Sequence, residues 1–151
     1  MKALLLAAGL GTRLRPLTNT LPKCLVPIHG KPLLEYWLEN LTKVGVDEFL
    51  VNTSYLSEQV EAFIVSSKYA KNVTLVYEEE LLNTGGTLLK NKEFFNDKPL
   101  MLAHAVNLCF CDFNAFIDSH HNRDNQCEMT MMLFKSDNPS SCGVVALDDS
   151  N

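Results

Sequence analysis

Apolar residues run without a break from Ala3 to Ala8 near the start of the chain. A short, uninterrupted apolar run is typical of a strand that is buried on both faces of a parallel sheet. Further β-rich runs follow along the chain. They predict five more strands, at residues 48–53, 73–78, 100–106, 127–134 and 143–147.

Between these runs, apolar residues recur at helical spacing. The clearest case is residues 32–44, where Pro32 suits the first position of a helix and Gly45 suits its end. Five large side chains share one face of this segment: Leu33, Leu34, Trp37, Leu38 and Leu41. We predict further helices at residues 57–70, with Ser57 as the N-cap, at 84–95, and at 112–120 with Asp112 as a cap.

Strands that alternate with helices indicate βαβ units. The chain is therefore predicted to be α/β, a single domain over residues 1–151, with a doubly wound, mostly parallel sheet and helices on both faces. In such a sheet the first and fourth strands are neighbours, and ligands bind beyond their carboxyl ends. The segments Gly9–Arg13 and His104–Asn107 should then face each other across a site.

The distribution of charge singles out the first of these segments. The chain carries a net charge of -5, yet five of its 13 Lys and Arg residues lie before the first acidic residue, Glu35. A basic stretch in an acidic chain predicts an anionic ligand, and a nucleotide fits better than a nucleic acid because no other basic run follows. The alternative is a tight turn with solvated basic residues.

The composition of the chain bears on its cellular location. No stretch approaches the roughly 18 apolar residues that span a membrane. The five cysteines are odd in number and are not spaced as a disulfide framework, which predicts a reducing, cytoplasmic setting. The apolar start is followed by Arg13 and Arg15 rather than by a cleavage site, which disfavours a signal peptide.

The loop after the first apolar run carries the candidate chemistry. Gly9 and Gly11 allow tight turns that expose successive N–H groups to an anion. Arg13 adds a forked donor for phosphate oxygens, and Lys23 adds a mobile point charge. The loop lacks the third glycine of the dinucleotide fingerprint, and no Walker-type phosphate loop is present.

Two segments near the start carry a long and specific motif: LAAGLGTRLRPLT and PKCLVPIHGKPLLEYWLENL. They resemble the signature of the sugar-phosphate nucleotidyltransferases, and the similarity continues through VYEEELLNTGGTL and LMLAHAVNL to CGVVALDDSN. The resemblance implies a Rossmann-like fold and a reaction that transfers a nucleoside monophosphate from a nucleoside triphosphate to a sugar 1-phosphate or similar phosphate monoester. It also implies that pyrophosphate is released. The metal that the resemblance implies is Mg²⁺.

The resemblance further implies that this chain corresponds to the first part of a typical family domain and lacks the C-terminal part. The partners expected are a nucleoside triphosphate and a sugar 1-phosphate, with no nucleic acid and no membrane. A homo-oligomer is left open.

The resemblance implies roles for individual residues at the positions that match the family motif. The nucleoside and phosphates would be contacted, largely through backbone atoms, by Leu6, Ala8, Gly9, Gly11 and Thr12. Arg13 would hold the leaving pyrophosphate, and Lys23 would bridge the α-phosphate and the incoming phosphate. Asn107 and Gly143 would contact the sugar.

The base would be recognised at the end of the third predicted strand. By resemblance, Glu78 would accept hydrogen bonds from the base edge and would suit donors such as those of guanine. Asn83 and Thr84 would complete the nucleotide contacts. The alternative is that Glu78, Glu79 and Glu80 form a solvated acidic run.

Three departures from the family pattern fall on functional positions. A GTAG-type turn is replaced by residues 83–86, NTGG, in which Asn83 tolerates positive φ. Val106 occupies the position of a magnesium-binding aspartate, and Ala146 stands where glutamate is frequent. Because valine cannot bind a hard dication, we predict the family fold with much reduced catalysis. The alternative is a non-catalytic nucleotide-binding or assembly domain.

A zinc site is a weaker interpretation. Cys109 and Cys111 with His104, His120 and His121 could supply ligands, but the CxC pair has no matching second pair.

Overall fold

The computed structural model describes residues 1–96 and 98–146. Two compact units make up the chain, Met1–Phe113 and Asn114–Asn151, which we call the N-terminal unit and the C-terminal unit.

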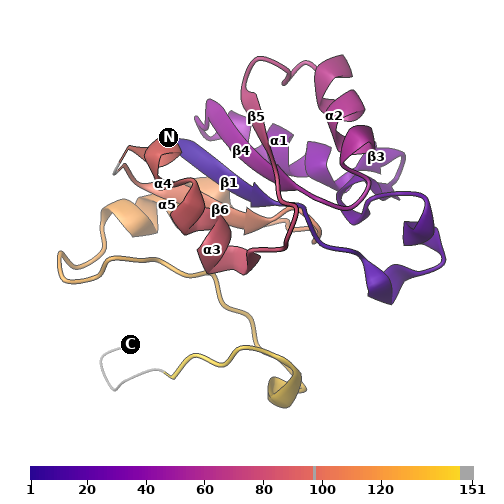
Figure 1. The fold of residues 1–151 in the computed structure, drawn as a ribbon. Helices are drawn as coiled ribbons and strands as arrows, with labels where there is room; N and C mark the ends of the chain where they lie inside the picture. The colour runs from indigo at the N-terminus through magenta and orange to yellow at the C-terminus, as the bar shows by residue number, and fades with distance from the viewer. Residues whose placement is uncertain (97, 147–151) are drawn as a thin grey trace. The chain divides into compact units, whose positions relative to one another are not determined.

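A four-stranded parallel sheet forms the centre of the N-terminal unit (Figure 1). Its strands are β1 (Lys2–Leu6), β4 (Glu48–Thr53), β5 (Val73–Tyr77) and β6 (Leu100–His104), in the order β5-β4-β1-β6. Leu4 of β1 lies opposite Leu50 of β4 and Leu102 of β6. The predicted α/β class is therefore confirmed, and so is the predicted pairing of the first and fourth apolar runs.

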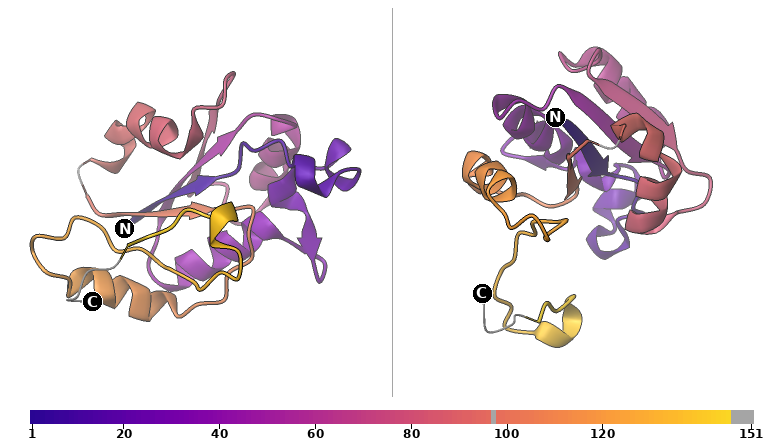
Figure 2. Two further views of the ribbon diagram at one scale, coloured as in Figure 1. Left: turned by 90° about the horizontal axis from the view of Figure 1, so that it is seen from below. Right: turned by 90° about the vertical axis from the view of Figure 1, so that its left-hand side faces the viewer.

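The strands are buried because their apolar residues are covered on both faces of the sheet. Ala3, Leu4 and Leu5 of β1 have no exposed surface. Leu4 packs in a cluster with Phe95, Leu88 and other apolar side chains, while alternate residues point to the opposite face. Figure 2, right, shows the sheet of this unit between α1 on one side and α3 and α4 on the other.

The first helix follows the sequence prediction closely. Helix α1 (Leu33–Lys43) buries all five predicted side chains and begins one residue after Pro32. Its last residue is Lys43, and Gly45, which adopts a φ of 88°, follows two residues later. The Gly45 N–H donates to the Thr42 carbonyl and the Val46 N–H to the Leu41 carbonyl, a Schellman motif that satisfies the last carbonyls of the helix.

The other helices differ in their boundaries. Helix α2 (Ser57–Ser66) follows Leu56, which has a φ of 53°, so Ser57 is the first helical residue and the prediction of Ser57 as N-cap is wrong. The predicted helix 84–95 is two helices, α3 (Asn83–Lys90) and α4 (Lys92–Phe95), separated at Asn91. Helix α5 (Phe113–His121) begins one residue after Asp112.

Short elements complete the N-terminal unit. Strands β2 (Pro27–Ile28) and β3 (Lys31–Pro32) form a small antiparallel pair. Three 3₁₀ turns shape the loop after β1: Thr12–Leu14, Leu17–Asn19 and Lys23–Leu25.

The predicted strands at residues 127–134 and 143–147 are wrong wherever the structure describes them. Residues 127–134 and 143–146 form no strand, and residue 147 lies outside the described residues. A β-rich run becomes a strand only when a neighbouring strand takes up its backbone hydrogen bonds. Here the apolar side chains stay exposed, with Phe134 at 82% and Val144 at 73%. Among the described residues after α5, the regular secondary structure is a 3₁₀ turn at Pro139–Ser141.

Candidate functional site

The loop after β1 is shaped by a close backbone contact. Gly11 has a φ of 64°, and a Cβ at this position would lie 3.0 Å from Thr18 Cγ2. Thr18 is almost fully buried, and its hydroxyl donates to the Gly11 carbonyl at 2.7 Å. Glycine is required here because a larger residue would meet both the left-handed backbone and the Thr18 side chain.

Helix α2 holds the far part of the same loop. The Tyr55 hydroxyl, just before this helix, donates to the Asn19 carbonyl at 2.9 Å, and Gln59 Nε2 donates to the Thr20 carbonyl at 3.0 Å. These bonds connect the backbone at Asn19 and Thr20 to residues at the start of α2 and just before it.

A cavity of about 280 Å³ opens at the carboxyl ends of the strands. From the loop it is lined by Ala8, Gly9, Gly11, Thr12, Arg13, Leu14 and Lys23. From the other segments it is lined by Leu6, Asn52, Glu78, Leu81, Asn83, Thr84, His104 and Val106. The structure thus brings the Gly9–Arg13 loop and the end of β6 to one cavity, as the strand order predicts.

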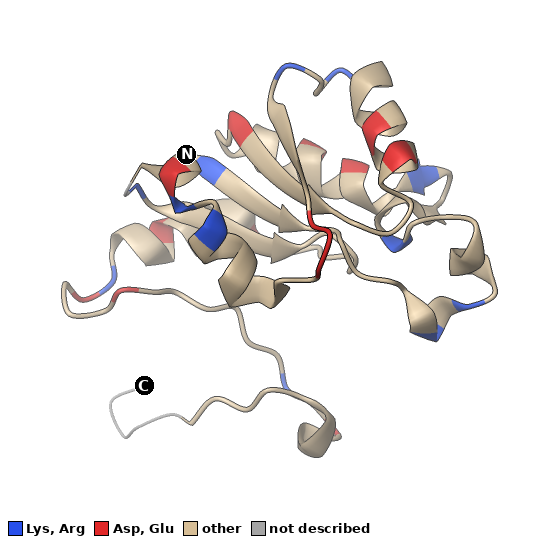
Figure 3. Ribbon diagram, in the orientation of Figure 1, with Lys and Arg blue, Asp and Glu red and all other residues tan. Residues whose placement is uncertain are grey.

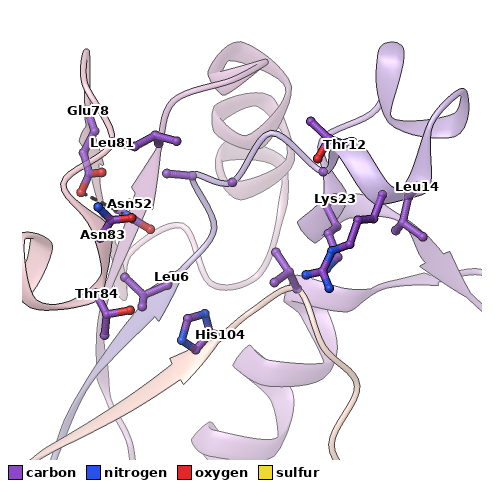
Figure 4. A pocket seen from close by; sticks show the side chains of 15 residues that line it. Leu6, Thr12, Leu14, Lys23, Asn52, Glu78, Leu81, Asn83, Thr84 and His104 are labelled. Atoms are coloured by element: carbon purple, nitrogen blue, oxygen red, sulfur yellow. Dashed lines mark hydrogen bonds between the residues drawn. The ribbon is translucent and has the colours of Figure 1, made fainter. Parts of the chain in front are cut away.

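The two sides of the cavity differ in chemistry. In Figure 4, Thr12, Leu14 and Lys23 lie on one side, Glu78, Asn52, Asn83 and Thr84 lie on the other, and His104 and Leu6 lie between them. Figure 3 shows the basic residues of the loop and the acidic residues after β5 on separate segments of the N-terminal unit.

Lys23 and Arg13 form the cationic side. Partial burial of Lys23 and, secondarily, the charge of Arg13 lower the pKa of the Lys23 ammonium. Two cations that repel each other are stabilised by an anion between them. This side of the cavity is therefore suited to phosphate oxygens.

Glu78 does not behave as part of a solvated acidic run. Glu79 and Glu80 are exposed, but Glu78 is only 2% exposed. Its Oε1 accepts from Thr87 Oγ1 at 2.5 Å and from Asn52 Nδ2 at 3.1 Å, and its Oε2 accepts from the Leu82 N–H at 3.2 Å. The alternative of a solvated run is right for its two neighbours and wrong for Glu78.

Asn52 is a site residue that the sequence interpretation missed. It is the next-to-last residue of β4, is 4% exposed, and its Oδ1 accepts from the Ala7 N–H at 2.7 Å. The available signal was a polar pair, Asn52 and Thr53, at the carboxyl end of a buried parallel strand, where ligands bind in such sheets. Leu14, Leu81 and His104 also line the cavity without having been assigned a nucleotide contact.

The NTGG turn takes up the backbone conformation expected of it. Asn83 has a φ of 58° at the start of α3, and both Asn83 and Thr84 line the cavity. Gly86 packs closely, since a Cβ there would lie 3.0 Å from Leu82 Cβ.

Two predicted sugar contacts are not among the cavity's lining residues. Asn107 is exposed, and its carbonyl accepts from Trp37 Nε1 at 2.8 Å. Gly143 belongs to the C-terminal unit and is exposed. Both contacts stay predictions.

The lining residues do not fit a magnesium ion. Val106 lines the cavity two residues after the end of β6, where the family resemblance implies an aspartate. Among the described residues that line the cavity, Glu78 is the single carboxylate, and its oxygens already accept three hydrogen bonds. Mg²⁺ prefers carboxylate oxygens in octahedral geometry, which this set does not offer.

Within residues 1–96 and 98–146, no three His, Cys, Asp or Glu side chains gather as metal ligands, so Cys109, Cys111 and the histidines form no such group there. His120 Nδ1 instead lies 3.0 Å from Thr130 Oγ1. No helix in the described residues is long and apolar enough to cross a membrane.

The fold and the polar cavity at its strand ends define an α/β protein with a doubly wound parallel sheet. Comparison with known families narrows this class. A family model described as Nucleotidyl transferase matches residues 2–151, and the chain belongs to this family.

Individual relatives are similar over most of this chain. The mannose-1-phosphate guanylyltransferase catalytic subunit beta of Danio rerio is 35% identical over 152 residues, which cover 98% of this chain and 42% of the relative. The UTP–glucose-1-phosphate uridylyltransferase of Synechocystis sp. is 32% identical over 161 residues, covering 99% of this chain and 42% of the relative. The chain therefore spans less than half the length of these curated relatives.

Solved structures share the fold. HddC from Yersinia pseudotuberculosis, in a complex with GMP-PN, has a TM-score of 0.69 and 28% identity, covering 80% of this chain and 54% of HddC. The CTP:phosphocholine cytidylyltransferase LicC from Streptococcus pneumoniae has a TM-score of 0.56 and 36% identity, covering 69% of this chain and 44% of LicC.

Proposed function

We propose that the cavity of the N-terminal unit binds a nucleoside triphosphate, with a sugar 1-phosphate or similar phosphate monoester as the second substrate. The observation that carries the proposal is the cavity itself, with Arg13 and Lys23 on one side and a polar turn on the other. The names of the relatives, which are guanylyl-, uridylyl- and cytidylyltransferases, support the same class of substrate.

The two sides of the cavity bind different parts of the nucleotide. The triphosphate lies along the N–H groups of Gly9–Arg13, where Arg13 holds the leaving pyrophosphate and Lys23 neutralises charge near the α-phosphate. The base lies toward Leu81, Asn83 and Thr84. In the transfer, an oxygen of the acceptor phosphate forms a bond to the α-phosphorus while the bond to the pyrophosphate oxygen breaks, and the protein supplies positioning and charge neutralisation.

Turnover by this chain is proposed to be low. Val106 provides no carboxylate for a metal, and Glu78 is occupied by its own hydrogen bonds. The same observation favours a second candidate function, a domain of this family that binds nucleotide without catalysing transfer. Binding is common to both candidates, and pyrophosphate release separates them.

Binding is tested by calorimetric titration of the four nucleoside triphosphates, each with magnesium and with EDTA. We expect saturable binding of at least one of them. Arg13→Gln and Lys23→Gln should each weaken it by about 10-fold or more, since a charge-assisted hydrogen bond contributes roughly 1.5–3 kcal/mol. Arg15→Gln, an exposed basic neighbour that does not line the cavity, is the matched control and should bind normally. No binding of any of the four would refute the proposal.

Turnover is tested by pyrophosphate release from a bound nucleotide and sugar 1-phosphates in the presence of magnesium. We expect little or no release by the wild type and a magnesium-dependent increase in Val106→Asp. Rapid release by the wild type would show that Val106 does not limit the reaction. A variant that remains inactive while binding nucleotide would favour the non-catalytic candidate.

A further inference from the structure

Three buried polar side chains meet beside the cavity, each from a different element of the N-terminal unit. They are Asn52 at the end of β4, Glu78 just after β5, and Thr87 in α3. Their exposed fractions are 4%, 2% and 0%. Burying a carboxylate is costly unless it is well hydrogen-bonded, so this arrangement indicates a specific role.

The hydrogen bonds form a continuous chain across the site. The Ala7 N–H, at the start of the glycine-rich loop, donates to Asn52 Oδ1 at 2.7 Å. Asn52 Nδ2 donates to Glu78 Oε1 at 3.1 Å, and Glu78 Oε2 accepts from the Leu82 N–H at 3.2 Å. Leu82 directly precedes Asn83, the residue at positive φ that begins the NTGG turn. The loop after β1 and the first turn of α3 are thus connected through two side chains, which Figure 4 shows directed toward each other.

Thr87 strengthens the connection from the other end of the turn. Its hydroxyl donates to Glu78 Oε1 at 2.5 Å, and Asn52 Nδ2 lies 3.3 Å from the Thr87 oxygen. Glu78 therefore holds both Leu82, before the turn, and Thr87, after it. Its carboxylate accepts three internal hydrogen bonds, which is most of what a carboxylate can accept.

We propose that Asn52 and Glu78 are positioning residues that hold the first turn of α3, Asn83–Gly86, at a fixed spacing from the glycine-rich loop. Glu78 then acts on a bound base through this turn and not by contacting the base. This inference rests on the proposed function, because it assigns how that same cavity holds the base end of a nucleotide. A residue that read the base directly would discriminate between bases. A residue that positions the turn affects all bases alike.

Glu78→Gln is the informative substitution. It keeps the size of the side chain, but whichever way its amide is turned, its NH₂ group faces an N–H donor, either the Asn52 amide or the Leu82 N–H. Glu79→Gln makes the same chemical change at an exposed neighbour and is the matched control. Affinities for the four nucleoside triphosphates and for inorganic pyrophosphate are measured at a temperature where circular dichroism shows both variants folded.

For Glu78→Gln we expect a loss of about 10-fold for every nucleotide that the wild type binds, as one buried charge-assisted hydrogen bond is lost. Pyrophosphate carries no base and should bind as to the wild type. Glu79→Gln should match the wild type with every ligand.

A double variant provides the rescue. When Asn52→Asp is combined with Glu78→Gln, the new carboxylate at position 52 still accepts from the Ala7 N–H. Its second oxygen accepts from the new amide at position 78, so the network is restored with reversed polarity. Nucleotide affinity should return to within about threefold of the wild type. Asn52→Asp alone places two carboxylates in contact and should lose stability. If Glu78→Gln does not fold, the folded double variant carries the test.

The results separate this inference from the proposed function. A loss confined to one base would show direct reading by Glu78 and overturn the inference. So would a folded Glu78→Gln variant that binds like Glu79→Gln, or a folded double variant that does not recover. A wild type that binds none of the four nucleotides would overturn the proposed function, and this role with it.

Discussion

The two units of this chain treat similar sequence patterns differently. In the N-terminal unit the apolar runs form β1, β4, β5 and β6, and each pairs with a neighbour in the parallel sheet. In the C-terminal unit the apolar runs at residues 127–134 and 143–146 form no strand, and their side chains are largely exposed. The difference shows that an apolar, β-rich run is only a candidate strand, because its backbone needs a partner and its side chains need a covered face.

The largest expected effect compares two leucines. Leu4 in β1 has no exposed surface, whereas Leu133 is 50% exposed. Leu4→Ala should lower the free energy of unfolding by about 3 kcal/mol, from lost burial and the cavity left behind. Leu133→Ala should change it by less than about 0.5 kcal/mol. Urea unfolding followed by circular dichroism measures both, and equal losses would contradict the distinction between the units.

A smaller effect compares two glycines. Gly11 has a φ of 64° and would place a Cβ 3.0 Å from Thr18, whereas a Cβ at Gly143 would meet nothing within 4 Å. Gly11→Ala should cost about 2 kcal/mol through the left-handed backbone and the contact with Thr18. Gly143→Ala should be nearly neutral. Unfolding curves of the two variants provide the measurement, and a neutral Gly11→Ala would show that the loop relaxes at little cost.

The smallest effect compares two cysteines and should leave the fold unchanged. Burial raises the pKa of the Cys24 thiol to about 12, so this thiol should resist alkylation until the N-terminal unit unfolds. Hydrogen bonds from Ser136 and Ser141 lower the pKa of the exposed Cys142 thiol. A lowered pKa means that the thiolate forms at lower pH. As the pH increases, the alkylation rate of Cys142 should therefore begin to rise at a pH below the ordinary pKa of a cysteine thiol.

Mass spectrometry of alkylated peptides across a pH series checks this comparison. Ser136→Ala should move the Cys142 profile to higher pH, and Cys142→Ser should remove the corresponding peptide label. Fast labelling of Cys24 in the folded protein would contradict its burial.

Much of the N-terminal unit could be predicted from the sequence, because buried parallel strands appear as apolar runs and α1 places five apolar residues on one face. The conformation of Leu56 could not, since a leucine at positive φ carries no sequence signal. It makes Ser57, the expected cap, the first residue of α2. The break at Asn91 between α3 and α4 was equally hidden.

The candidate site was predictable in outline and not in its hydrogen bonds. The glycine-rich loop, Arg13 and Lys23 follow from local sequence, and the strand order brings them near Val106. Asn52, Glu78 and Thr87 lie far apart in sequence and meet only in the fold. An acidic run is expected to be solvated. Glu78 differs from its neighbours by its burial and by the hydrogen bonds from Asn52, Thr87 and Leu82, which the sequence does not show.

The central claim is that the cavity of the N-terminal unit binds a nucleoside triphosphate. Amide chemical-shift mapping of the ¹⁵N-labelled protein during titration with each of the four nucleotides tests it most directly. We predict saturable shifts at Gly9–Arg13, Lys23 and the Leu82–Thr87 segment, with residues 128–146 unchanged. The absence of saturable shifts with all four nucleotides, or shifts concentrated in residues 128–146, would contradict the account.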